Sequence, residues 1–220
     1  MPDATRGGRL FLALPLPDDA RQRLAERCRS LQPISWLRVA PPGNHRVTLQ
    51  FFGEVPAERV AAAERVLVAV ASRGAEAELT LGGFATLPPR GAPRVIYARP
   101  TGPTAGVEQL IGDARAVSRE QGFAVDGRPP LPHVTVARSR RETRSGGHLS
   151  RPAAAGPAAQ VAAPTWAPLP AHVRLPEAAL RPWDTPLHVR LTAVSLYRSH
   201  LRAGGAEYEE LATKPLRGAP

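Results

Sequence analysis

Apolar positions in the first third of the chain follow a strand pattern, then a helical one, and then repeat that order. An apolar strand is expected over 9–16, followed by a helix that begins near Pro17 and runs to about Ser30. A second strand over 47–52 is ended by Gly53, and an amphipathic helix is expected from Pro56 onward.

The middle of the chain shows a comparable series. Strand patterns over 78–84 and 93–98 precede a helical pattern over 104–121, and an apolar strand follows at 131–138. The order strand, helix, strand therefore occurs twice and ends each time in a strand that carries a threonine. This weak internal duplication predicts two similar lobes that face each other.

The last third begins with a change of composition. Residues 145–182 are rich in Ala, Pro and Gly, which predicts a long loop inserted outside either core. Regular strand patterns return at 187–191 and 194–197, and Gly204-Gly205 predicts the turn of a terminal hairpin. We therefore expect a single bilobal α+β domain over 1–220 with a loop insertion at 145–182.

The strand at 131–138 carries a histidine and a threonine two positions apart. Side chains alternate faces along a strand, so His133 and Thr135 share one face while Val134 and Val136 share the other. A group that exchanges a proton near neutral pH then lies beside a hydroxyl that can hydrogen-bond an oxyanion. This pair suits phosphate chemistry, although the polar face of an ordinary strand is the alternative.

Charge and cysteine content narrow the classes of function. The 220 residues carry a net charge of +10, and because Lys214 is the sole lysine, nearly all of the positive charge is arginine. Arginine favours phosphate or nucleic-acid ligands, unless its abundance only reflects a composition biased toward Arg, Ala, Pro and Gly. Cys28 is the sole cysteine, which excludes an intrachain disulfide and a cysteine-based metal site and predicts a cytoplasmic protein.

Neither a signal peptide nor a membrane helix is expected. The apolar stretch 10–14 is broken by Pro15, and no segment approaches the ~20 apolar residues that a membrane-spanning helix needs. We therefore expect no contact with a membrane.

The segments 9–17, 196–199 and 204–208, together with the motif His133-Val134-Thr135-Val136, carry a resemblance to a known family. The chain resembles the 2H phosphoesterase superfamily and, more closely, the RNA 2',3'-cyclic phosphodiesterases, also called 2'-5' RNA ligase-like proteins. The resemblance implies two antiparallel sheets that form a central groove with helices on the outside. It also implies two facing His-x-Thr-x motifs, one in each lobe.

The first motif departs from the family pattern. Where family sequences read Asn-Leu-His-Leu-Thr-Leu, this chain reads Asn44-His45-Arg46-Val47-Thr48-Leu49. An ungapped match puts Arg46 at the histidine position and on the same strand face as Thr48. His45 then points the opposite way, unless a bulge turns it into the groove. We favour Arg46 in the groove.

The resemblance also implies the chemistry and the ligands. His133 would be the general base for water that opens a 2',3'-cyclic phosphate to a 2'-phosphate, with Thr135 and Thr48 holding phosphate oxygens. The acid would be the histidine of the first motif, and Arg46 cannot replace it because its pKa lies above ~12. No metal or cofactor is implied. The partners would be RNA ends or nucleotides with a 2',3'-cyclic phosphate, bound by a monomer.

Secondary contacts follow from position along the strands. Arg138 is expected near phosphate unless it is only a solvated strand end. Phe51 and Tyr197 are candidates for stacking on a base, with core packing as the alternative. The resulting hypotheses are a hydrolase with reduced turnover, and a catalytically weak or inactive protein that binds nucleotides or RNA ends. Ligation of 2'-5' ends and hydrolysis of a small cyclic nucleotide are further options.

Overall fold

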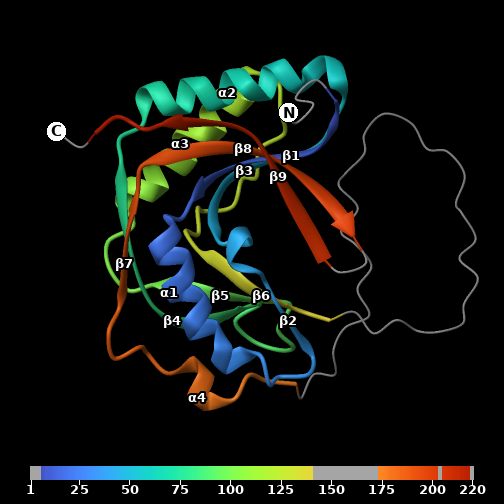
Figure 1. The fold of residues 1–220 in the computed structure, drawn as a ribbon. Coiled ribbons are helices and arrows are strands. Elements are labelled where there is room, and N and C mark those ends of the chain that lie inside the picture. The colour runs from blue at the N-terminus through green and yellow to red at the C-terminus, as the bar shows by residue number, and fades with distance from the viewer. Residues whose placement is uncertain (1–5, 141–172, 203–204, 219–220) are drawn as a thin grey trace, which may run out of the picture.

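The computed structural model describes residues 6–140, 173–202 and 205–218 (Figure 1). The helices are α1 (Asp18–Cys28), α2 (Val60–Arg73), α3 (Ala105–Glu120) and α4 (Glu177–Leu180). The strands are β1 (Gly8–Pro15), β2 (Leu37–Val39), β3 (Arg46–Val55), β4 (Ala77–Leu87), β5 (Val95–Pro100), β6 (Val134–Ser139), β7 (Leu187–Leu191), β8 (Ala193–Arg202) and β9 (Gly205–Pro215).

The strands form two antiparallel halves that meet at a narrow junction. Their order is β7-β4-β5-β6-β3-β1-β8-β9, and β2 pairs with β6. Between β6 and β3 a single pair, Val47 opposite Val134, joins the two halves. The predicted fold class is confirmed, and the halves form one continuous path of strands through that pair. The strands of the two sequence repeats fall in different halves, but their helices α1 and α3 each lie over the half that holds the strands of the other repeat (Figure 1).

The long helices cover the outer face of the half that contains β1. Figure 1 shows α2 and α3 side by side above β1, β3 and β8, with α1 lying over the other half. The α3 residues that recur at helical spacing are buried, as the sequence pattern predicts. These residues are Val107, Leu110, Ile111, Ala114 and Val117.

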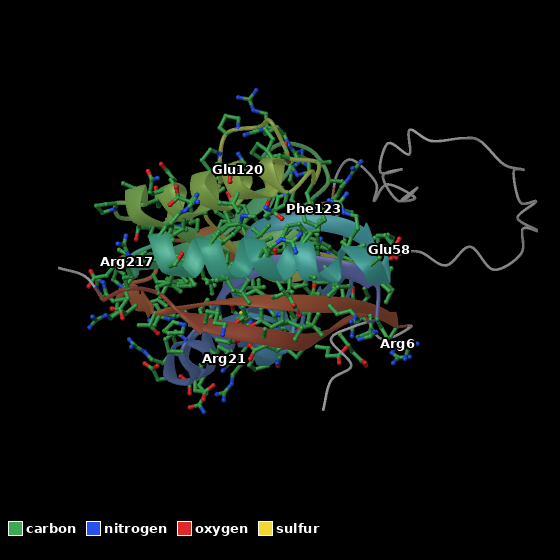
Figure 2. The ribbon with its side chains drawn as sticks, turned by 90° about the horizontal axis from the view of Figure 1, so that it is seen from above. Arg6, Arg21, Glu58, Glu120, Phe123 and Arg217 are labelled. Carbon is green, nitrogen blue, oxygen red and sulfur yellow. The ribbon has the colours of Figure 1, made fainter. Side chains whose placement is uncertain are left out.

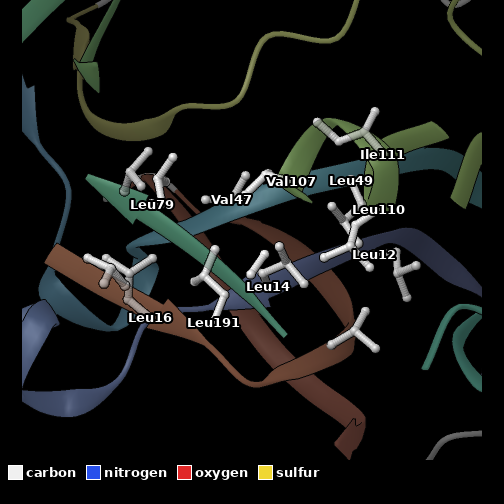
Figure 3. Packing of buried hydrophobic residues seen from close by; sticks show 14 of the residues in the cluster. Leu12, Leu14, Leu16, Val47, Leu49, Leu79, Val107, Leu110, Ile111 and Leu191 are labelled. Atoms are coloured by element: carbon white, nitrogen blue, oxygen red, sulfur yellow. The ribbon is translucent and has the colours of Figure 1, made fainter. Parts of the chain in front are cut away.

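Strand β1 is buried on both of its faces. Leu10, Leu12 and Leu14 belong to the main hydrophobic core, which Figure 3 shows together with Val47 and Leu49 of β3. The alternate residues of β1, Phe11 and Ala13, form a separate cluster with Tyr197 and Tyr208 on the opposite face. Strand β1 therefore reads as a continuous apolar run, and its second face lies on the side away from α2 and α3.

Part of the predicted insertion is ordered structure. Residues 145–172 lie outside the described residues, but 173–182 include the short helix α4, and Leu175 is buried in the main core. The prediction that all of 145–182 lies outside either core is therefore wrong at its end. A single buried leucine makes no repeating apolar pattern, so the sequence does not reveal this contact. The strand β2 has only three residues and is likewise too short to show such a pattern.

Candidate active site

The junction of the two halves brings the two motifs onto one face. Because Val47 and Val134 are paired and both belong to the core, their neighbours on each strand turn to the opposite face. Antiparallel register then sets Thr48 across from His133, and the backbone of Arg46 across from Thr135. The positions that share this face are Arg46, Thr48, His133 and Thr135.

His133 is half-buried immediately before β6 and is held in place by two contacts. Its Nδ1 donates a hydrogen bond to the Leu131 carbonyl at 2.7 Å, since a carbonyl oxygen only accepts. Its ring meets the Tyr97 ring edge to face, at 5.3 Å between centroids. With the proton fixed on Nδ1, Nε2 is the nitrogen that can accept a proton.

The surroundings of His133 favour its neutral form. Burial is the largest effect and lowers the pKa of His133, and the charge of Arg138 lowers it further, while the hydrogen bond with the Leu131 carbonyl opposes them. The imidazole is therefore available as a base at neutral pH.

A bulge in β6 brings Arg138 to the face of His133. Tyr97 pairs with Thr135 while Ile96 pairs with Ala137, so Val136 is an extra residue in the ladder. The alternation of side chains shifts by one position there, and the exposed Arg138 shares the face of Thr135 although the two are three residues apart.

Arg46 extends away from His133, across β1 and toward β8 and β9. Its guanidinium carbon lies 4.0 Å from the centroid of the Tyr197 ring and 4.5 Å from that of Tyr208. Its Nη2 donates to the Gly43 carbonyl, and the residue is 7% exposed. Within the described part of the chain, Nε and Nη1 have no hydrogen-bond partner. Burial lowers the pKa of Arg46, but a guanidinium that starts above ~12 still holds its proton at neutral pH.

His45 lies off the face that carries the motifs, because it precedes Arg46 and strand side chains alternate. It is 1% exposed, and both ring nitrogens are buried without a hydrogen-bond partner among the described residues. Burial is the largest effect and lowers the pKa of His45 to about 4, while the nearby backbone of Arg21 opposes this shift and the charges of Arg46 and Arg21 add to it. The bulges of β3 fall later in the strand, near Leu49 and Phe52, so none of them turns His45 toward His133.

A row of aromatic rings crosses the same face of the sheet. Phe51 stacks on Phe11 at 5.2 Å between centroids, and Phe11 stacks on Tyr197 at 5.3 Å. Phe51 is 52% exposed and leaves room for a ligand. Tyr197 is buried, contacts Arg46, and donates its hydroxyl to Glu210 at 2.9 Å. Of the two predicted stacking residues, Phe51 is open to a base and Tyr197 is packed.

Sequence reasoning missed the partners that line this face. Phe11 could have been found from the alternation of 9–16, but Tyr208 and Glu210 come from the terminal hairpin and carry no local signal. In the described ranges, no three His, Cys, Asp or Glu side chains gather closely enough to hold a metal ion. The helices found there are also too short or too polar to cross a membrane.

A model of the 2'-5' RNA ligase superfamily matches residues 45–203. The chain belongs to that superfamily. The match includes both motif strands, so the family resemblance of the sequence is confirmed.

Curated relatives of the chain share one name, RNA 2',3'-cyclic phosphodiesterase. The protein of Geobacillus stearothermophilus is 31% identical over 132 residues, which cover 58% of this chain and 41% of that protein. The protein of Thermus thermophilus is 31% identical over 143 residues, covering 60% of this chain and 69% of the relative. The protein of Escherichia coli is 32% identical over 138 residues, which cover 61% of this chain and 73% of that protein.

Solved structures show the same fold. The crystal structure of TT0787 of Thermus thermophilus has a TM-score of 0.70 at 24% identity and covers 96% of this chain and 98% of its own. Apo LigT of Escherichia coli has a TM-score of 0.66 at 22% identity, and the match covers 96% of this chain and 99% of LigT.

Proposed function

We propose that this protein opens 2',3'-cyclic phosphate ends of RNA by attack of water, leaves a 2'-phosphate, and uses no metal ion. The observation that carries the proposal is the face shared by a neutral, oriented His133 with Thr48 and Thr135. The name common to its relatives supports the same reaction.

In this reaction His133 Nε2 takes a proton from the attacking water as the new P–O bond forms. The P–O3' bond breaks, the phosphate stays on O2', and O3' gains a proton, so one water is consumed for each end opened. The hydroxyls of Thr48 and Thr135 donate to non-bridging oxygens, where negative charge grows in the phosphorane. The charge of Arg138 offsets part of it.

The proton for O3' is the weak step. Arg46 holds its proton and points into the aromatic cluster, and His45 is neutral and buried away from solvent. O3' then takes its proton from solvent, and turnover should fall by roughly the 10²- to 10⁴-fold that a general acid contributes. We infer a slow phosphodiesterase with an intact phosphate site.

A binding protein for nucleotides or RNA ends is the second candidate, favoured because the described residues place no general acid beside His133. The deciding experiment incubates the protein with 2',3'-cyclic AMP in a chelator and separates the products by chromatography. We expect slow formation of 2'-AMP that His133→Ala abolishes. Binding measured by calorimetry without turnover would establish the second candidate, and neither binding nor turnover would refute both.

Ligation of 2'-5' ends would pass through the same phosphorane in reverse. It is tested by offering the protein a cyclic-phosphate end together with a 5'-hydroxyl RNA. That the protein acts as a cytoplasmic monomer stays a prediction.

A further inference from the structure

The face that carries the motifs continues past the aromatic row to a second basic site. Along β1 the groove-facing residues are Ala13 beside Thr48, then Phe11 beside Phe51, and then Arg9. Four residues of strand separate Ala13 from Arg9, about 13 Å at ~3.3 Å per residue. One nucleotide and the reach of an arginine side chain can span that distance together.

Arg9 lies at the edge of a hollow of about 680 Å³ at the end of β1 and β8. Figure 2 shows Arg6 at this end of the sheet. Arginines outnumber the acidic residues that line the hollow. The arginines are Arg6, Arg9, Arg198 and Arg202, and the acids are Glu54 and Glu209.

The hollow reaches both faces of the sheet, because Arg198 stands opposite the core residue Leu10 and so lies on the face away from Arg9. On that face one of the two acidic side chains, Glu209, is already paired with a cation. Arg198 is buried, donates to Glu209 at 3.1 Å and donates to the Arg6 carbonyl. His200 also contacts Glu209, at 3.0 Å. Arg9 lies on the motif face with Glu54 as its cross-strand neighbour. Its side chain makes no hydrogen bond or ion pair with any described residue, so its N–H groups can donate to a ligand.

We propose that Arg9, at the edge of this hollow, binds a phosphate upstream of the RNA end held at His133, so that the protein prefers oligonucleotide ends to mononucleotides. The inference rests on the proposed function and names its substrate class. Arg138, the ring of Phe51 and Arg9 follow one another along one face of the sheet. This order matches single-stranded RNA whose base stacks on Phe51 while its phosphates contact the arginines. The solvent-exposed ring of Phe51 lies between Thr48 and Arg9, whereas Arg138 lies on the far side of His133 from Arg9.

The test compares kcat/KM for 2',3'-cyclic AMP with kcat/KM for a dinucleotide and a trinucleotide that end in the same cyclic phosphate. We expect the wild type to favour the longer substrates about tenfold, the effect of one charge-assisted hydrogen bond. Arg9→Gln should reduce this ratio to about one, while Arg23→Gln, which removes an equal charge from exposed α1, should keep it. Melting temperatures verify that both variants fold.

Binding supplies a second readout that does not need turnover. The affinity for a trinucleotide ending in a 3'-phosphate, measured by fluorescence anisotropy against salt, should depend on salt less steeply in Arg9→Gln, by about 0.7 in the log–log slope. If the wild type turns over no cyclic phosphate but keeps this Arg9-dependent binding, the proposed function fails and the upstream site stands. A length preference that survives Arg9→Gln and disappears in Arg138→Gln would overturn the inference, as would equal kcat/KM for all three substrates.

Discussion

Strands β3 and β6 meet at Val47 and Val134 in matching register, yet they carry different chemistry on the face they share. Immediately before β6, His133 is half-buried, neutral and fixed by the Leu131 carbonyl. On β3, Arg46 is buried against Tyr197 and points away from the junction. The apolar faces of the two strands set the scaffold of the groove, while the proton chemistry depends on single positions on the other face. One motif can therefore lose its acid–base group while the groove keeps its shape.

The Arg46 position is not optimised for stability. Contact with aromatic faces contributes roughly 2 kcal/mol when a cation is desolvated. Two of its N–H groups, at Nε and Nη1, are buried without a partner among the described residues, and each such group costs about 1–3 kcal/mol. The two costs together equal or exceed the gain from the rings, so substitution of Arg46 should not lower stability much.

The largest effect is expected from restoring the symmetry of the two motifs. Arg46→His places a shorter imidazole over β3, near Thr48 and across from Thr135, where it can protonate O3'. We expect kcat for 2',3'-cyclic AMP to rise by up to about 10²- to 10⁴-fold. Arg46→Gln is the matched control, because it removes the same charge without adding a proton donor. If the two variants are equally active, a missing acid is not what limits turnover.

The next effect concerns the buried histidine of the first motif, His45. The pKa of His45 is about 4 in the fold against an ordinary 6.5, so the unfolded chain binds the proton first. This group therefore lowers stability as pH falls from 6.5 toward 4, by about 3 kcal/mol in total, and has no further pH effect above 6.5. His45→Leu should remove this part of the pH dependence.

Urea denaturation of the wild type and of His45→Leu at pH 7 and pH 4.5 measures the effect. His200→Leu serves as the control, because His200 is partly exposed and contacts Glu209 at the edge of the sheet. Identical pH dependence in the wild type and His45→Leu would mean that His45 titrates in contact with water.

A smaller effect is expected at the exposed end of the aromatic row. Phe51→Ala removes the ring on which a base would stack, worth about 1–3 kcal/mol, so KM should rise about tenfold with kcat nearly unchanged. Val68→Ala on α2 is the control, since Val68 is also 52% exposed. Steady-state kinetics separate KM from kcat, and a loss confined to kcat would show that Phe51 positions the phosphate instead.

The smallest effect is a shift of the titration of His133. Arg138 lowers the pKa of His133, so Arg138→Gln should raise it and move the acid limb of the pH–rate profile to higher pH. Arg140→Gln, two residues further on, is the control. A limb that stays at its wild-type position would place Arg138 out of electrostatic reach of His133.

Alternation and helical spacing were sufficient to predict the main helices and strands and the shared face of His133 and Thr135. They could not reveal the extra residues Leu49 and Val136, because a bulge is defined by pairing with a second strand. Those bulges bring Phe51 and Arg138 onto the face of the motifs. The direction of Arg46 was equally hidden, because rings far later in the sequence, those of Tyr197 and Tyr208, determine it.

The pH dependence of kcat/KM for wild-type hydrolysis of 2',3'-cyclic AMP tests the central claim that, among the described residues, His133 alone transfers a proton. With His133 as the sole titrating residue, the rate should rise through a pKa below 6.5 and then stay level into the alkaline range. A bell-shaped profile whose alkaline limb disappears in His45→Ala would show that His45 reaches the groove as the acid, and would contradict the account.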